Sequence, residues 1–157
     1  MGFVIRFGAG LVLGQLAIAY LPPIERWAVM NTLGSLRLVA WCFGLHSDIE
    51  GDSFHVGPSQ IQIIGECTPV MPTSVLAAAI AAYPTVLRAQ LLGIVAGAVV
   101  IWAFNLLRIA SLMVVLAWRP GSFDFIHMYL WQTVTLFVVL LIFLLWARLQ
   151  RPRGETP

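Results

Sequence analysis

The sequence predicts an all-α integral membrane protein: a bundle of about four to five membrane helices with one small extracytoplasmic β-hairpin. Of the 157 residues, 60% are hydrophobic and 10% are charged, whereas a typical soluble domain is about 25% charged. Several apolar runs reach the length of about 20 residues that a helix needs to cross a bilayer. Too few polar side chains remain to cover a soluble surface, which excludes an ordinary cytosolic domain, a disordered chain and a nucleic-acid binder.

The charged residues and the cysteines limit the possibilities further. All nine basic residues are arginines, seven residues are acidic, and the formal net charge is +2. Ionisable side chains are costly in lipid, so each one needs an explanation. The two cysteines, Cys42 and Cys67, are too few for a disulfide framework, although they could form one bridge. A chain of this length is expected to form one membrane domain, residues 1–157.

The first expected helix covers residues 3–21 and ends before Pro22. Gly10 and Gly14 are spaced as the small residues that let helices pack closely in lipid. The run also resembles a secretory signal, because Arg6 precedes the apolar residues. It is longer than a signal core of about 7–15 residues, so we expect a membrane helix that is retained.

Residues 24–45 allow two interpretations. The segment is apolar overall, but Arg26 and Arg37 are eleven residues apart and therefore share one helix face. Arginines on one face suit a helix that lies in the membrane interface with its charged ends extended to water. The segment is therefore predicted as an interfacial or a membrane helix.

Residues 46–66 differ in composition from the rest of the chain. Four of the seven acids occur here, namely Asp48, Glu50, Asp52 and Glu66. Two short runs, Ser53–Val56 and 60–64, flank a turn that contains Gly57 and Pro58. This pattern predicts a small β-hairpin on a surface that faces water.

Three further membrane helices are expected at residues 68–87, 89–118 and 128–147. Thr68 is placed to cap the first of them, with Pro69 at its first position. All three helices consist mainly of apolar residues, as the interior of a bilayer requires.

The arginines predict how these helices are oriented. One side of the membrane would hold Arg88, Arg148, Arg151 and Arg153, the last three in the tail 148–157. The positive-inside rule puts that side in the cytoplasm, and therefore Cys67 and the hairpin outside. If the first helix starts in the cytoplasm, residues 24–45 lie on the outer surface; if they span, the N-terminus is outside. We expect the first arrangement.

Three chemically suited side chains are then expected at the outer face. Residues 89–107 cover about 28 Å at 1.5 Å per residue, close to the thickness of the bilayer core. Arg108 therefore lies at the outer end of its helix, level with Cys67, and His127 lies at the outer start of the last helix. Arg108 is the one charge in an apolar run that continues to residue 118, which is typical of a functional residue.

Each candidate also has a purely structural interpretation. Most membrane cysteines are inert apolar residues, and an interfacial histidine such as His127 can simply contact headgroups. Asn105 lies one turn before Arg108 on the same face and could support it. No ligand spacing links His46 or His55 to a metal site, and no metal or cofactor is expected.

A resemblance to a known family is carried by three runs: GEC at 65–67, NLLRI at 105–109, and FDFIH at 123–127 followed by WQ at 131–132. These runs resemble the exosortase/archaeosortase family, and their spacing and the short chain are most similar to exosortase H. The resemblance covers roughly residues 46–147. Many relatives have Ser-Gly or Asn-Gly after the cysteine, whereas here Thr68 and Pro69 follow it.

The resemblance implies a multi-pass cysteine peptidase or transpeptidase of the cell (inner) membrane, with Cys67, Arg108 and His127 as catalytic residues and its active site on the extracytoplasmic face. Its substrates would be exported proteins with a C-terminal sorting signal, made of a short motif, a transmembrane helix and a basic tail. A surface glycan or lipid would be the acceptor, with hydrolysis as the default.

These residue types suit that chemistry. A Cys67 thiolate would form a thioester, and the imidazole of His127 would transfer protons. Arg108 would stabilise either the thiolate or the oxyanion. The alternatives are a non-catalytic membrane partner or transporter subunit, and a thiol redox protein.

Overall fold

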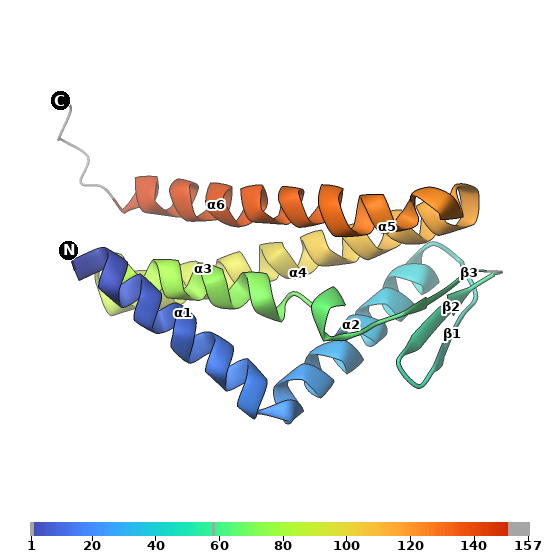
Figure 1. Cartoon of the computed structure of the whole chain (residues 1–157), viewed down its shortest axis with the longest axis horizontal. Helices are drawn as coiled ribbons and strands as arrows, with labels where there is room; N and C mark the ends of the chain where they lie inside the picture. Colours follow the sequence, from blue (N-terminus) through green and yellow to red (C-terminus); the bar gives the residue numbers. More distant parts are fainter. Residues whose placement is uncertain (1, 58, 151–157) are drawn as a thin grey trace.

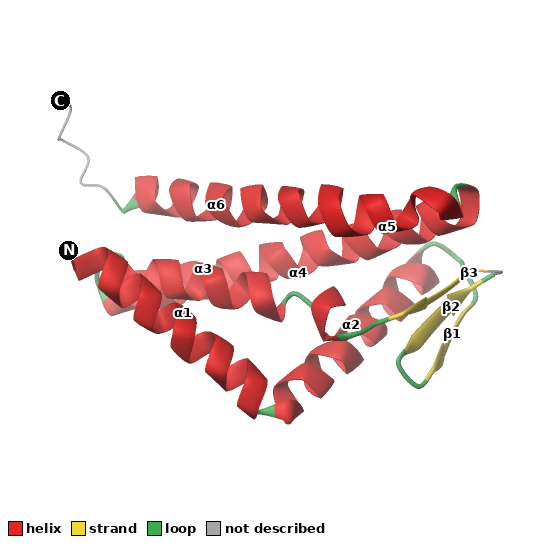
Figure 2. Cartoon of the chain, viewed as in Figure 1, coloured by secondary structure: helices red, strands yellow, loops and turns green. Residues whose placement is uncertain are grey.

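The computed structural model describes residues 2–57 and 59–150, and it consists mainly of helices with one small sheet (Figures 1 and 2). Pro58 of the expected turn and Arg151 and Arg153 of the expected tail lie outside the described residues. The elements in chain order are α1 (Gly2–Tyr20), α2 (Pro22–Cys42), β1 (Ser47–Glu50), β2 (Ser53–Val56), β3 (Ser59–Gln62), the 3₁₀ turn η1 (Gly65–Cys67), α3 (Val70–Ala82), α4 (Leu87–Trp118), the 3₁₀ turn η2 (Pro120–Ser122), α5 (Phe123–Phe125), the π-turn η3 (Ile126–Leu130) and α6 (Trp131–Leu149).

Three helices are long and apolar enough to cross a membrane: α1, α4, and the continuous helical stretch from residue 120 to residue 149. The prediction of a helical protein of the membrane type is confirmed to this extent. Helix α4 has 32 residues and is therefore about 48 Å long, which is well beyond the thickness of a bilayer core. Its last turns extend past the membrane-length part of the bundle toward the sheet (Figure 1).

Helix α3 is shorter than the expected helix 68–87. It has 13 residues, about 20 Å, and packs in the middle of the bundle against α1, α4 and α6. It ends at Ala82 because Pro84 drives the preceding Tyr83 into an extended conformation, with φ −75° and ψ 131°. The chain then turns directly into α4.

Small residues let these helices approach closely, as the spacing of Gly10 and Gly14 predicts for α1. Gly10 of α1 lies against Ala78 of α3, and Gly97 of α4 lies against the side chain of Leu76. Gly93 of α4 leaves room for the indole of Trp146. These approaches form an apolar core that consists of Leu76, Ile80, Ile101, Val139, Trp146 and Ala147.

Helix α2 leaves α1 at an angle after Leu21, so the two helices form a V rather than an antiparallel pair (Figure 1). Among the described residues, α2 is not one of the three helices that are long and apolar enough to span a membrane. Its buried face, which includes Val29, Leu33 and Leu36, packs with Phe54 of the sheet and Ile109 of α4 in a second apolar core.

The predicted β-hairpin is present as β2 and β3, which pair antiparallel with Phe54 opposite Ile61. A third strand, β1, pairs with the other edge of β2 and places Ile49 opposite Phe54. This strand was not predicted, because its four residues include two acids and lack a run of β-branched or aromatic side chains. The sheet covers one side of α2 and holds the chain that leads into η1.

Candidate active site

Cys67 is the last residue of η1, the short 3₁₀ turn between the sheet and α3. Its backbone N–H donates to the carbonyl of Ile64 at 2.8 Å. The Thr68 hydroxyl donates to the carbonyl of Gly65 at 2.6 Å, so this side chain closes η1 and does not cap α3. The expectation that Thr68 is the helix cap is therefore wrong: α3 starts at Val70, and Pro69 precedes it.

Asn105 of α4 holds this turn from the opposite side. Its side-chain amide donates a buried hydrogen bond of 2.8 Å to the backbone carbonyl of Cys67. Asn105 is 4% exposed, and a buried hydrogen bond of this kind is costly to break because the carbonyl is left unsatisfied. The supporting role predicted for Asn105 thus has a concrete form, which is to tie the Cys67 turn to α4.

Arg108 lies one turn further along the same face of α4 and is 8% exposed. Its guanidinium lies within electrostatic range of the Cys67 side chain. Its Nε is buried and has no hydrogen-bond partner within the part of the chain that the structure describes. A buried guanidinium with a free donor is unusual, because buried charges are normally paired. This N–H is therefore a donor that a bound anionic group could use.

His127 is half-buried in the π-turn η3, immediately before α6. Its ring packs against Phe123, with the ring centroids 5.5 Å apart. The charged groups within its electrostatic range are Arg108, Asp124 and Glu66. Single π-turns inside helices are rare and often occur at functional sites. The sequence did not predict this turn, because nothing in its apolar pattern distinguishes a π-turn from an ordinary helix.

The predicted residues therefore form one cluster at the junction of η1, α4 and η3. Arg108 lies within electrostatic range of both Cys67 and His127. No hydrogen bond joins Cys67 directly to His127 within residues 2–57 and 59–150. Glu66 and Asp124 were not predicted as members of the site, although each lies within one of the runs that carry the family resemblance.

The cysteine itself is covered by apolar neighbours. Cys67 is 7% exposed and belongs to the same core as Val29, Ile63 and Ile109. Cys42 is exposed, and both cysteines are free, so the structure contains no bridge between them. The described residues include no group of three His, Cys, Asp or Glu side chains that could hold a metal ion.

No family model, curated protein or solved structure matches this chain. The resemblance to the exosortase/archaeosortase family therefore remains a prediction, which rests on three short runs of sequence. In the structure, Cys67, Arg108 and His127 of these three runs lie near one another although they are far apart in the chain.

Proposed function

We propose that this protein is a membrane-embedded cysteine transpeptidase of the exosortase type, which cleaves C-terminal sorting signals from exported proteins and transfers them to a surface acceptor. The observation that carries the proposal is the buried Arg108. Its Nε has no hydrogen-bond partner among the described residues, and its guanidinium lies within electrostatic range of Cys67. Asn105 holds the same turn in place through the Cys67 carbonyl. Two polar side chains of one helix thus support a single cysteine.

The chemistry follows from the residue types. The Cys67 thiolate attacks the scissile carbonyl carbon, and the C–N bond breaks to leave an acyl group on sulfur as a thioester. The imidazole of His127 accepts the thiol proton and later delivers it to the departing amine. An amine or hydroxyl acceptor, or water by default, then releases the acyl group.

Arg108 serves this reaction as a cation with a free donor. Beside the thiol it stabilises a thiolate, and beside the scissile carbonyl it donates to the oxyanion. Its burial strengthens either interaction, because charges interact more strongly where water is excluded.

The proposal includes a position in the membrane. Arg88 at the start of α4 and Arg148 near the end of α6 lie at the same end of the bundle, opposite the sheet (Figure 1). By the positive-inside rule, that end is cytoplasmic. The site then lies on the extracytoplasmic side of the inner membrane, with α1, α4 and α6 as the spanning helices and the shorter α3 packed between them. The transmembrane helix of the substrate would lie beside this bundle.

The test is co-expression with a tagged substrate that ends in a motif, an apolar helix and an arginine cluster, such as one encoded near this gene. Cys67→Ala is expected to abolish its processing. Cys42→Ala, which changes the exposed cysteine, is the matched control and is expected to retain it. Unchanged processing in Cys67→Ala would overturn the proposal, and loss of processing in Cys42→Ala would favour a redox role.

A second candidate is a non-catalytic membrane partner or transporter subunit, in which Asn105 and Arg108 only join helices. The observation that favours it is the burial of Cys67, since an inert cysteine is commonly buried among apolar side chains. Trapping an acyl-thioester on Cys67 in purified protein would exclude this candidate. Full function of the Cys67→Ala variant in the host would support it.

A further inference from the structure

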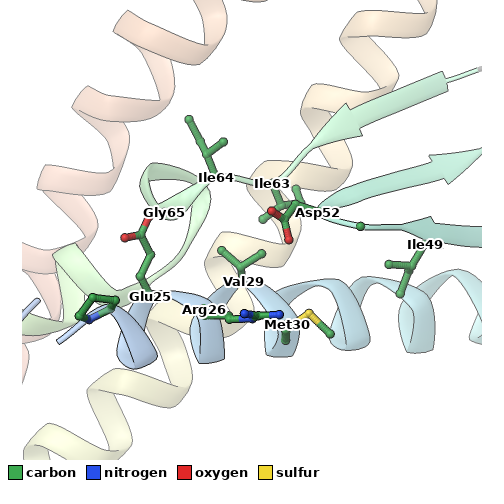
Figure 3. A pocket seen from close by; sticks show the side chains of 11 residues that line it. Glu25, Arg26, Val29, Met30, Ile49, Asp52, Ile63, Ile64 and Gly65 are labelled. Atoms are coloured by element: carbon green, nitrogen blue, oxygen red, sulfur yellow. The ribbon is translucent and has the colours of Figure 1, made fainter.

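A cleft of about 850 Å³ opens between α2 and the sheet, beside the turn that carries Cys67 (Figure 3). Its walls are the first turns of α2, the β1–β2 turn and the segment that leads from β3 into η1. The apolar part of its lining consists of Pro22, Val29, Met30, Ile49, Ile63 and Ile64. The mechanism proposed above does not use this cleft.

The cleft shares a wall with the surroundings of the nucleophile. Val29 and Ile63 line the cleft and also pack in the same core as Cys67. Gly65 lines the cleft two residues before Cys67, and the carboxylate of Glu25 lies directly against it. A Cβ at position 65 would collide with this carboxylate, so the glycine is what allows Glu25 to reach the Cys67 turn.

Three charged side chains line the cleft, and they come from two elements. Glu25 and Arg26 belong to α2, and Asp52 belongs to the β1–β2 turn. Figure 3 shows the two carboxylates on different walls, Glu25 beside Gly65 and Asp52 on the sheet side. None of the three forms an ion pair with another described residue. His55 and Glu50, 4.0 Å apart, form such a pair only when the histidine is protonated. These charges are therefore free to bind a charged ligand.

We infer that this cleft binds the acceptor of the transfer reaction, a primary amine that also carries an anionic group. The inference rests on the proposed transpeptidase function. Glu25 and Asp52 hold the ammonium, since carboxylates form the strongest hydrogen bonds with charged donors. Arg26 holds the anionic group, and the apolar lining holds the carbon chain between them. Glu25 lies against Gly65, two residues before Cys67, so this end of the cleft adjoins the turn that would carry the thioester.

The transfer step balances without a further reactant. The bound ammonium first releases one proton to water and becomes a neutral amine. Its nitrogen attacks the thioester carbon, the C–N bond forms, and the C–S bond breaks. His127 takes the second proton from nitrogen and passes it to the departing sulfur of Cys67. The products are an amide and a free thiol.

The experiment uses the purified full-length chain in nanodiscs with a tagged sorting-signal substrate and triglycine as the acceptor. Mass spectrometry gives the ratio of triglycine adduct to hydrolysed product, which depends on the fate of the thioester and not on its rate of formation. The Glu25→Gln/Asp52→Asn double variant is expected to lower this ratio at least tenfold. Asp48→Asn is the matched control, because Asp48 is an exposed acid on β1 that does not line the cleft.

Reactions with other acceptors, and one further variant, test which groups of the acceptor the cleft recognises. N-acetyl-triglycine, which lacks the amine, is expected to give no adduct. Arg26→Gln is expected to lower transfer to triglycine but not to ethanolamine, which has no anionic group. Nanodiscs that contain phosphatidylethanolamine show whether a lipid headgroup with the same two charges is also an acceptor.

The outcomes separate this inference from the function on which it rests. If the thioester forms and the double variant keeps the wild-type ratio, the acceptor site is wrong and the transpeptidase stands. If the double variant instead blocks thioester formation and leaves the ratio unchanged, the cleft binds the substrate peptide and the inference is overturned. If the wild-type chain forms no thioester, the proposed function fails and this inference fails with it.

Discussion

The side-chain amide of Asn105 donates a hydrogen bond of 2.8 Å to the backbone carbonyl of Cys67. This bond joins α4 to a turn that is 38 residues away in the chain. Because Arg108 lies one helical turn from Asn105, the bond also sets where the Arg108 guanidinium lies relative to the Cys67 thiol. One buried amide thus connects the stability of this region to the geometry of the candidate site.

Replacing Asn105 with leucine is expected to lower both stability and processing. The Cys67 carbonyl would lose its donor inside the protein, which costs about 1–3 kcal/mol. Thermal unfolding in detergent measures the first effect, and cleavage of a tagged substrate measures the second. The control is Asn31→Leu, because Asn31 is exposed and its amide bonds only to Trp27 of its own helix. Equal stability of the two variants would show that the bond to Cys67 contributes nothing.

Replacing Arg108 with methionine is expected to separate activity from stability. Loss of an oxyanion donor typically lowers the rate about 10²–10³-fold. The folded state, by contrast, is expected to keep or gain stability. No acid among the described residues forms an ion pair with the buried Arg108, so its replacement by methionine removes a desolvation cost. Arg119→Met is the control, since Arg119 is exposed just after α4. A destabilised Arg108→Met variant with normal processing would assign Arg108 a structural role instead.

Much of the fold could be predicted from the sequence, because lipid imposes a local requirement. A helix that crosses a bilayer must be apolar over its whole length, so α1, α4 and α6 are visible as apolar runs. The end of α3 and strand β1 depend on local geometry and on pairing, which hydropathy does not report.

The candidate site could be predicted in part for the same reason. Arg108 is conspicuous because a charge in an apolar run needs a local explanation. Glu25 and Asp52 carry no such signal, since acids are ordinary on a surface that faces water. They are 27 residues apart in the sequence, and only the packing of α2 against the sheet makes them line one cleft.

Because Gly97 lies close to Leu76, α4 is expected to tolerate no larger side chain at position 97 without a loss of stability. A Cβ at position 97 would collide with the Leu76 side chain, and overpacking of this kind costs typically about 1–3 kcal/mol. Gly97→Ala should therefore lower the thermal midpoint in detergent. Combining it with Leu76→Val should destabilise less than the sum of the two single changes.

Gly8→Ala is the control for this prediction. Gly8 lies in α1 with open space around it, and alanine is a better helix former than glycine. This variant is expected to keep or slightly raise the midpoint. Strict additivity of the Gly97 and Leu76 changes would show that the two helices adjust without strain.

Replacing His127 with alanine tests the third member of the cluster. General acid–base catalysis contributes typically about 10²–10⁴-fold, so processing should fall by a factor in that range. Stability should change little, because the ring is half-buried and its contact with Phe123 is one aromatic pair at the surface of the bundle. Processing of the tagged substrate and thermal unfolding are measured on the same preparations.

The control for this change is His55→Ala, which removes the histidine of the sheet that pairs with Glu50. It is expected to retain processing, since neither partner belongs to the cluster at the junction of η1, α4 and η3. If His127→Ala retains processing while Cys67→Ala abolishes it, another base must act on the thiol. Asp124 and Glu66 are then the residues to change, because both lie within electrostatic range of the same ring.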